Sequence, residues 1–240
     1  MNLDVIVFAA HPDDAELTMG GTIARLVAEG KKVGIIDVTR GELGTRGTPE
    51  TRQKEAFQAA VILKIASREN LYIPDGEIED NKENLSKLLI CIRKYRPKLI
   101  FAPYKNDRHP DHIKLSALVK QAFFSSGLTK IKTFDKDTPQ EAYRPAKLFY
   151  YMQTYTFEPS FIVDISDYFE IKKKAMMAYA TQFYDPNSTE PNTFISTPEF
   201  VEFIRAKAEF YGFKIGRKYG EPFFTEEELE LDLVHYLNRL

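Results

Sequence analysis

Two short histidine-containing segments carry most of the side chains that could do chemistry. His11-Pro-Asp-Asp14 and His109-Pro-Asp-His112 together hold three of the four histidines in the 240-residue sequence. Catalytic zinc sites use about three ligands from His, Asp or Glu and leave one position for water. His11, Asp14 and His112 could supply such a set, and Fe²⁺ or Mn²⁺ would accept similar donors. The pattern therefore predicts one metal ion per chain, most simply Zn²⁺.

The remaining polar side chains of these segments suit hydrolysis of a carbonyl compound. Asp13 would take a proton from a metal-activated water, because such a water ionises near neutral pH. His109 would face the carbonyl oxygen as negative charge develops on it. Asp111 could hold the second nitrogen of His109 and fix its tautomer. We predict that these three residues are catalytic.

Each segment could instead simply begin a helix. Asp13 and Glu16 have the spacing of a capping box, and His109 precedes a proline suited to a first helical turn. A helix cap needs no histidine, however. Two such segments at neighbouring strand ends favour a metal site.

The elements that must position these segments alternate between strands and helices. Leu3–Ala10 and Lys98–Ala102 are continuous apolar runs, which are typical of strands buried on both faces. Between and after them we expect strands at Lys32–Thr39 and Asn70–Ile73, and helices at Ala15–Glu29, Glu50–Lys64, Asn81–Tyr95 and Asp111–Ser125. This alternation predicts an α/β fold: a Rossmann-like, doubly wound, mostly parallel sheet. In the strand order 3-2-1-4, both histidine segments lie at the same sheet edge, where ligands bind in such folds.

The alternation weakens after about residue 126. We expect a single domain over residues 1–240, with the Rossmann-like core over about 1–126 and a C-terminal α/β extension over about 127–240. In that extension we expect a loop at Lys130–Arg144, strands at Lys147–Gln153 and Phe161–Ile165, helices at Asp167–Ala180 and Pro198–Tyr211, and a solvated, helix-like acidic run at Thr225–Leu233. His235 lies in the last segment, and we assign it no function.

Composition excludes several classes of function. Hydrophobic residues make up 43% of the chain and charged residues 28%, with a formal net charge of −2, so no nucleic-acid partner is expected. No apolar stretch approaches the ~20 residues of a membrane span, and the N-terminus lacks a basic leader. The lone cysteine, Cys91, forms no internal disulfide and is expected in the core. We expect a cytoplasmic protein.

Three segments resemble the LmbE-like, or PIG-L, family of zinc-dependent de-N-acetylases: AHPDDAELTMGGTIARL, TRGELGTRGTPETRQKEA and NDRHPDH. MMAYATQFYDP and EFVEFIRAKAEFYGFKIG look most like the subgroup of bacillithiol biosynthesis, which deacetylates N-acetylglucosaminyl malate. The resemblance implies metal binding by His11, Asp14 and His112 and general-base duty for Asp13. It also implies an electrostatic or acid role for His109, with Asp111 behind it. Relatives form hexamers, so a homo-oligomer is expected.

The resemblance also points to two substrate-binding arginines, Arg52 and Arg108. A planar guanidinium binds a carboxylate through two parallel hydrogen bonds, and malate offers two carboxylates. One departure stands out: some relatives carry a tyrosine where this chain has Asp107, so an oxyanion role of that tyrosine does not transfer. Gln182 lies in a shared segment, without a physical account of its role.

Two alternatives remain open on the sequence. The substrate could be another N-acetyl sugar or the amide of a thiol conjugate. The chain could also be a non-enzymatic, Rossmann-type nucleotide-binding module, although the G-x-G-x-x-G pattern is absent after the first strand and acidic residues stand where phosphate would lie.

Gly20 and Gly21, inside the first expected helix, indicate close packing of that helix against the sheet.

Overall fold

A computed structural model describes residues 1–232 of the chain. Its elements, in chain order, are β1 (Val5–Ala9), α1 (Asp14–Ala28), β2 (Val33–Asp37), α2 (Pro49–Leu63), β3 (Ser67–Asn70), α3 (Lys82–Tyr95), β4 (Leu99–Pro103), α4 (Pro110–Ser125), β5 (Phe134–Asp135), β6 (Thr138–Pro139), β7 (Lys147–Tyr151), β8 (Phe161–Asp164), α5 (Phe169–Met177), α6 (Pro198–Lys214) and β9 (Gly220–Phe224). Within these residues a seven-stranded sheet has the order β3-β2-β1-β4-β7-β9-β8, and β5 and β6 form a separate small hairpin.

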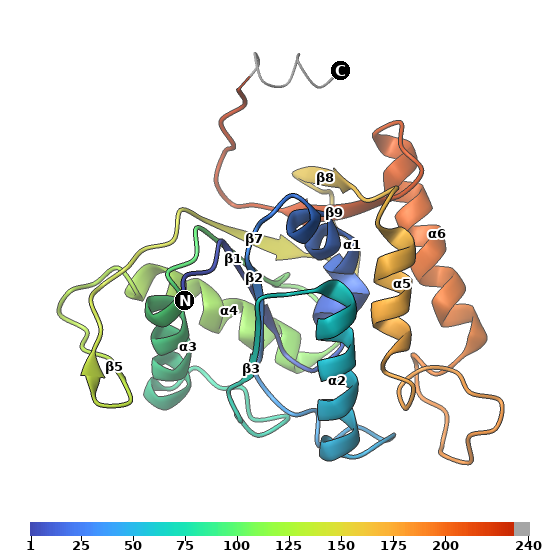
Figure 1. Cartoon of the computed structure of the whole chain (residues 1–240), viewed down its shortest axis with the longest axis horizontal. Coiled ribbons are helices and arrows are strands. Elements are labelled where there is room, and N and C mark those ends of the chain that lie inside the picture. Colours follow the sequence, from blue (N-terminus) through green and yellow to red (C-terminus); the bar gives the residue numbers. More distant parts are fainter. Residues whose placement is uncertain (233–240) are drawn as a thin grey trace.

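The first half of the sheet confirms the doubly wound prediction. Strand β1 pairs in parallel with β2 on one side and β4 on the other, which is the expected 3-2-1-4 order. Helices α3 and α4 cover one face, and α1, α2 and α5 cover the other (Figure 1). Ile6 and Phe8 of β1 pack into the core beneath α3 and α4, while Val5 and Val7 pack into the core beneath α1. A strand buried on both faces needs the continuous apolar run that the sequence has.

The C-terminal part extends the same sheet instead of forming a separate one. Strand β7 is parallel to β4, whereas β9 is antiparallel to both β7 and β8. Strand β9 was not expected, because its sequence, GEPFF, contains glycine and proline and resembles a turn.

Two other sequence predictions were wrong in detail. The strand expected at Asn70–Ile73 lies at Ser67–Asn70, because the polar edge strand SREN lacks the apolar pattern of its neighbours. The acidic run is not helical over residues 225–232, while Leu233 and His235 lie outside the described residues. Cys91 is buried in the core as expected, and burial raises the pKa of its thiol to about 12. No helix within residues 1–232 is long and apolar enough to cross a membrane.

The two glycines of α1 allow close packing, as expected, but against a different partner from the sheet face. A Cβ on Gly21 would lie 2.7 Å from Cδ1 of Ile165, just beyond β8, and a Cβ on Gly20 would lie 3.1 Å from Cγ of Lys172 on α5. Helix α1 can therefore lie directly against α5 and the end of β8.

A buried ion pair holds the middle of α1. The helix is interrupted at Met19, and the freed backbone N–H groups of Gly21 and Thr22 donate to the carboxylate of Glu221 at 3.0 and 2.6 Å. Lys172 Nζ lies 2.6 Å from the same carboxylate. Strand β9 and helix α5 thus fix the helix whose first turn carries the predicted metal ligand Asp14.

Candidate metal centre

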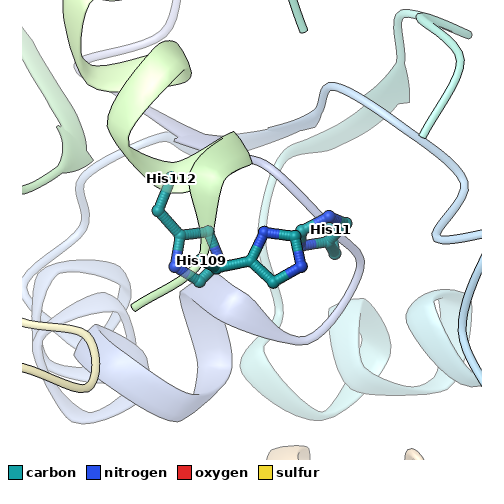
Figure 2. A group of neighbouring side chains, drawn as sticks. All are labelled: His11, His109 and His112. Carbon is teal, nitrogen blue, oxygen red and sulfur yellow. The ribbon is translucent and has the colours of Figure 1, made fainter. Parts of the chain in front are cut away.

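Parallel pairing of β1 with β4 brings the two histidine segments together. The ring centroids of His11 lie 4.7 Å from His109 and 5.5 Å from His112, and those of His109 and His112 lie 5.0 Å apart. Nitrogens of the three rings fall within 4.8 Å of one another. Figure 2 shows the rings gathered between the turn after β1 and the start of α4. The predicted convergence is confirmed.

Asp14 lies between two of these rings. One carboxylate oxygen is 3.4 Å from Nδ1 of His11, and the other is 3.3 Å from Nε2 of His112. Ligand atoms about 3.3 Å apart are what a tetrahedral ion with bonds of about 2.0–2.1 Å requires. The nitrogen and oxygen donors therefore fit a zinc ion, which would occupy the space among these three side chains.

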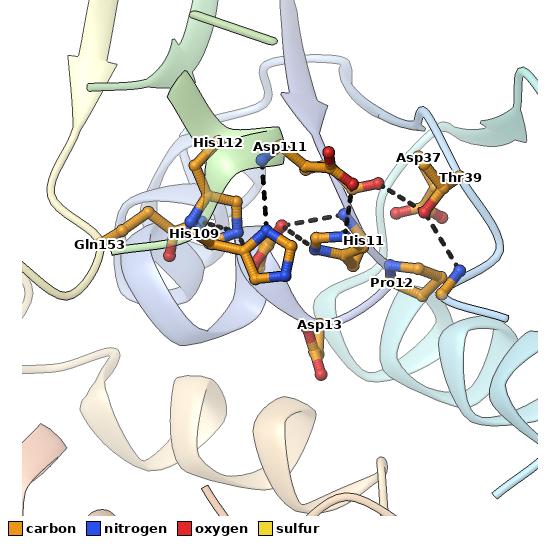
Figure 3. A network of polar contacts seen from close by, with 12 residues as sticks. His11, Pro12, Asp13, Asp37, Thr39, His109, Asp111, His112 and Gln153 are labelled. Carbon is orange, nitrogen blue, oxygen red and sulfur yellow. Dashed lines mark hydrogen bonds and ion pairs between the residues drawn. The ribbon is translucent and has the colours of Figure 1, made fainter. Parts of the chain in front are cut away.

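In His11 and His112, the outer ring nitrogen faces a carboxylate (Figure 3). His11 Nε2 lies 3.1 Å from Asp75 Oδ1 and 3.4 Å from Asp111 Oδ2, and His112 Nδ1 lies 2.8 Å from Asp107 Oδ1. A carboxylate on the outer nitrogen fixes the tautomer of a metal-binding imidazole and leaves the inner nitrogen unprotonated for the metal. Although burial opposes protonation, Asp14 and Asp107 raise the pKa of His112 to about 9. The surroundings favour a positive charge here.

The carboxylate of Asp111 does not hold His109, which corrects the prediction. It contacts His11 and accepts the N–H of Gly76 at 2.9 Å, while the backbone N–H of Asp111 donates to His109 Nδ1 at 3.2 Å. The neutral ring of His109 then carries its proton on Nε2. Burial lowers the pKa of His109, which favours this neutral form. His109 also caps α4 and Pro110 follows it, so the helix-start interpretation holds alongside the chemical one.

Asp13 does not cap α1, so the capping-box interpretation was wrong. Its side chain makes no capping hydrogen bond, and Glu16 instead pairs with Arg68. The backbone of Asp13 has φ of 113°, a strained conformation for a residue other than glycine. Burial raises the pKa of Asp13 to about 7, although Arg52 opposes the shift. In Figure 3 its carboxylate points away from the three imidazoles.

Arg52 is buried against Asp13. Its guanidinium donates to Asp13 Oδ2 at 3.2 Å and to the carbonyl oxygens of Pro12 and Gly41. Gly41 has φ of 67°, and a Cβ there would lie 2.0 Å from Nη1 of Arg52, so only glycine fits. These contacts orient Asp13, while contact between Arg52 and substrate stays a prediction.

A cavity of about 350 Å³ opens over this centre. Its lining contains seven of the eight predicted site residues: His11, Asp13, Asp14, Arg52, Arg108, His109 and His112. Arg108 has no hydrogen bond or ion pair with any described residue, and its guanidinium carbon lies 4.4 Å from the ring centroid of Phe194. The N–H groups of Arg108 are therefore available to a ligand.

The contacts of Gln182 explain its structural role. Its Nε2 donates to the carbonyl oxygen of Arg46 at 2.7 Å, and Arg46 Nη1 in turn donates to the carbonyl oxygen of Phe183 at 3.0 Å. The two segments that hold Gln182 and Arg46 both line the cavity or lie beside it. Gln182 therefore joins the loop between β2 and α2, here called the glycine-rich loop (Gly41–Gly47), to the C-terminal part.

Three polar residues of the site were missed in the sequence. Asp75 follows β3 and Asp107 follows β4 at the same sheet edge, so topology could have indicated both. Gln153, just after β7, lies 3.4 Å from His112 Nε2, and it carried no comparable signal. Asp107, noted above only as a departure, is the carboxylate behind His112.

Comparisons with known proteins indicate the family and the fold of the chain. The PIG-L family model, described as GlcNAc-PI de-N-acetylase, matches residues 6–123. Diacetylchitobiose deacetylase of Thermococcus kodakarensis is 28% identical over 232 residues, spanning 90% of this chain and 80% of that protein. A conserved protein of Thermus thermophilus has 40% identity and a TM-score of 0.85, over 96% of this chain and 98% of that one. N,N'-diacetylchitobiose deacetylase of Pyrococcus horikoshii, solved with an inhibitor, has 30% identity and a TM-score of 0.75, over 91% and 82%.

Proposed function

Because this chain belongs to the PIG-L, or LmbE-like, family of de-N-acetylases, we propose that it is a zinc-dependent hydrolase that removes the acetyl group from an N-acetylglucosaminyl conjugate. The observation that carries the proposal is the position of Asp14, whose two oxygens face His11 and His112 at 3.4 and 3.3 Å. Asp13 lies beside it in the same cavity.

We assign the metal to His11, Asp14 and His112 and leave His109 for the substrate. The carboxylates behind His11 and His112 support this set, because each leaves one inner nitrogen for the metal. Within residues 1–232 no carboxylate pairs with His109, whose Nδ1 accepts a backbone N–H. One competing set consists of the three imidazoles. Asp14→Ala should lose zinc, and His109→Ala should keep it; the opposite result in a metal analysis would favour the three imidazoles.

The chain's own residues then move the protons of amide hydrolysis. A bound zinc ion supplies Lewis acidity and an activated water at neutral pH. Asp13 accepts a proton through its carboxylate, which Arg52 holds in place. His109 Nε2–H donates to the oxygen of the acetyl carbonyl as negative charge develops there. The oxygen of the water bonds to the acetyl carbon, the C–N bond breaks, and the sugar nitrogen takes the proton that Asp13 accepted from the water, so that acetate and a free amine leave.

For the substrate, we favour N-acetylglucosaminyl malate in bacillithiol biosynthesis. The available guanidinium of Arg108 at the cavity supports an aglycone with a carboxylate. A second candidate is an N-acetylated disaccharide such as diacetylchitobiose, because relatives with that name cover most of the chain. Assembly as a homo-oligomer stays a prediction from the resemblance.

The test combines metal analysis with acetate release from N-acetylglucosaminyl malate, N-acetylglucosamine and diacetylchitobiose. Asp13→Asn should retain zinc but lose acetate release by about 10²–10⁴-fold, the usual contribution of a general base. Asp167→Asn, at an exposed aspartate outside the cavity, is the matched control and should behave like the wild type. Full activity in metal-free protein would overturn the proposal.

A further inference from the structure

The cavity has an aromatic side that the proposed chemistry does not use. Phe194, Phe200 and Phe203, here called the aromatic wall, all line it. Phe200 is only 9% exposed, and its ring centroid lies 5.6 Å from Phe194 and 6.2 Å from Phe203. The outer two rings are 50% and 44% exposed. The wall therefore has a buried middle and two open ends.

One face of α6 builds most of this side. Phe200, Phe203, Ile204 and Lys207 all line the cavity, and their spacing of three and four residues places them on one helix face. Phe210, on the same helix, is 58% exposed and does not line it. Half-exposed apolar rings gathered at a cavity with polar surroundings are typical of ligand-binding surfaces.

Phe194 also contacts Arg108. Of the two predicted substrate-binding arginines, Arg108 is the one without a hydrogen bond or ion pair to a described residue. The guanidinium carbon of Arg108 lies 4.4 Å from its ring centroid, well within the range of a cation–π interaction. Arg108 is exposed and lies in the loop between β4 and α4. Without such a contact, a long exposed arginine side chain would sample many rotamers, and binding a ligand would cost that freedom.

Polar contacts join the segment that carries Phe194 to the glycine-rich loop on another side of the cavity. Glu190 accepts the N–H of Gly47 at 3.0 Å, and its other oxygen lies 3.6 Å from Nε of the buried Arg46. Ser196 Oγ accepts the N–H of Thr193 at 2.7 Å. These contacts place Phe194 relative to the glycine-rich loop, which forms another part of the cavity lining.

We propose that Phe194 is a positioning residue for substrate selection: its ring holds the guanidinium of Arg108 at the cavity, where that guanidinium takes a carboxylate of the aglycone. This inference rests on the proposed deacetylase function. It commits the site to conjugates with an anionic aglycone, because no described carboxylate neutralises Arg108. A neutral disaccharide would gain nothing from the Phe194–Arg108 contact.

A double-mutant cycle tests the inference through KM and kcat. Phe194→Ala should raise KM for N-acetylglucosaminyl malate about two- to fivefold, the worth of a cation–π contact at an exposed site, with kcat unchanged. For N-acetylglucosamine alone, KM should change less than about twofold. In an Arg108→Ala background, Phe194→Ala should have no further effect on the malate conjugate. Phe194→Tyr keeps an aromatic face and should restore the wild-type KM.

Phe210→Ala is the matched control, because it removes an exposed ring of α6 outside the cavity. The melting temperature of each variant separates loss of fold from loss of selection. The inference is overturned if Phe194→Ala raises KM equally for both substrates, leaves KM for the malate conjugate unchanged, or acts as strongly without Arg108. If wild-type protein releases acetate from neither substrate, the proposed function itself fails, and the inference fails with it.

Discussion

Replacing Asp107 by asparagine would test whether the carboxylate behind His112 supports metal binding. Asp107 Oδ1 lies 2.8 Å from His112 Nδ1 and accepts the backbone N–H of His109 at 3.1 Å. Oδ2 accepts the N–H groups of Thr154 and Tyr155 at 2.8 and 3.2 Å. Asparagine keeps the size of the side chain but replaces one of these acceptor oxygens with an NH₂ group. The NH₂ group would then face other donors: either the ring of His112 and the N–H of His109, or the N–H groups of Thr154 and Tyr155.

The magnitude follows from these contacts. Loss of a carboxylate partner behind a metal-binding histidine weakens metal affinity about 10–100-fold, or about 1.4–2.7 kcal/mol. If the asparagine oxygen stays on His112, the loss moves to the Thr154 and Tyr155 amides, and the turn after β7 loses about 1.5–3 kcal/mol of charge-assisted hydrogen bonding instead. We expect zinc affinity to fall at least about tenfold, because a charged acceptor is lost in either orientation.

The assay is a competition titration of zinc between the protein and a chelator of known affinity, with a thermal melt of the metal-free form. Asp185→Asn is a suitable control, because Asp185 is exposed and, among the described residues, its carboxylate hydrogen-bonds only to Asn187 of its own turn. Unchanged zinc affinity in an Asp107→Asn protein would refute the reasoning. A lower melting temperature of the metal-free form with unchanged affinity would show that Asp107 supports the fold alone.

Two further predictions concern the packing of α1 and a buried charge. Gly21→Ala should lower the free energy of unfolding by about 1–3 kcal/mol in urea titrations, because its Cβ would overlap Ile165 at 2.7 Å. Gly20→Ala should cost less, because its Cβ would lie 3.1 Å from Cγ of Lys172, and equal costs would contradict the packing account. Burial lowers the pKa of Lys207 to about 7, and the positive charge of a second lysine adds to the shift. The charged groups near it are Lys172, Asp107 and Glu221. The unfolded chain then binds more protons than the folded one between about pH 7 and 10.5, so the free energy of unfolding should rise by about 2 kcal/mol from pH 7 to 9. Lys207→Met should lose this rise, and a variant with the same slope would exclude Lys207 as its source.

Much of the parallel half of the fold could be predicted, because burial of its strands on both faces requires apolar residues there. A strand buried on both faces must be apolar at every position, and β1 and β4 are. Strand β9 escaped prediction because its neighbours are distant in the sequence: it lies between β7 and β8 and ends a long return of the chain. Its Glu221 looks like a surface residue until Lys172 and the interrupted α1 are seen around it.

The candidate site was also predicted only in part. Convergence of the two histidine segments follows from strand order, which the alternation of elements already predicts. The partners of individual side chains do not, because they depend on angles within the first turn of each helix. Asp111 shows this: it is adjacent to His112 in the chain, yet its carboxylate contacts His11 of the other segment. No spacing rule separates that arrangement from the expected contact with His109.

Carboxylates from three separate places in the chain would decide which nitrogen His11 and His112 offer to a metal ion. Asp75, Asp107 and Asp111 come from the loop after β3, the loop after β4 and the start of α4, and each contacts an outer nitrogen of His11 or His112. A histidine motif by itself leaves both ring nitrogens equivalent. Because the backbone amides of Thr154 and Tyr155 also hold Asp107, the C-terminal half contributes to the position of a proposed metal ligand of the N-terminal half, His112. The first 126 residues therefore contain every proposed metal ligand but not the full set of contacts that would set their geometry.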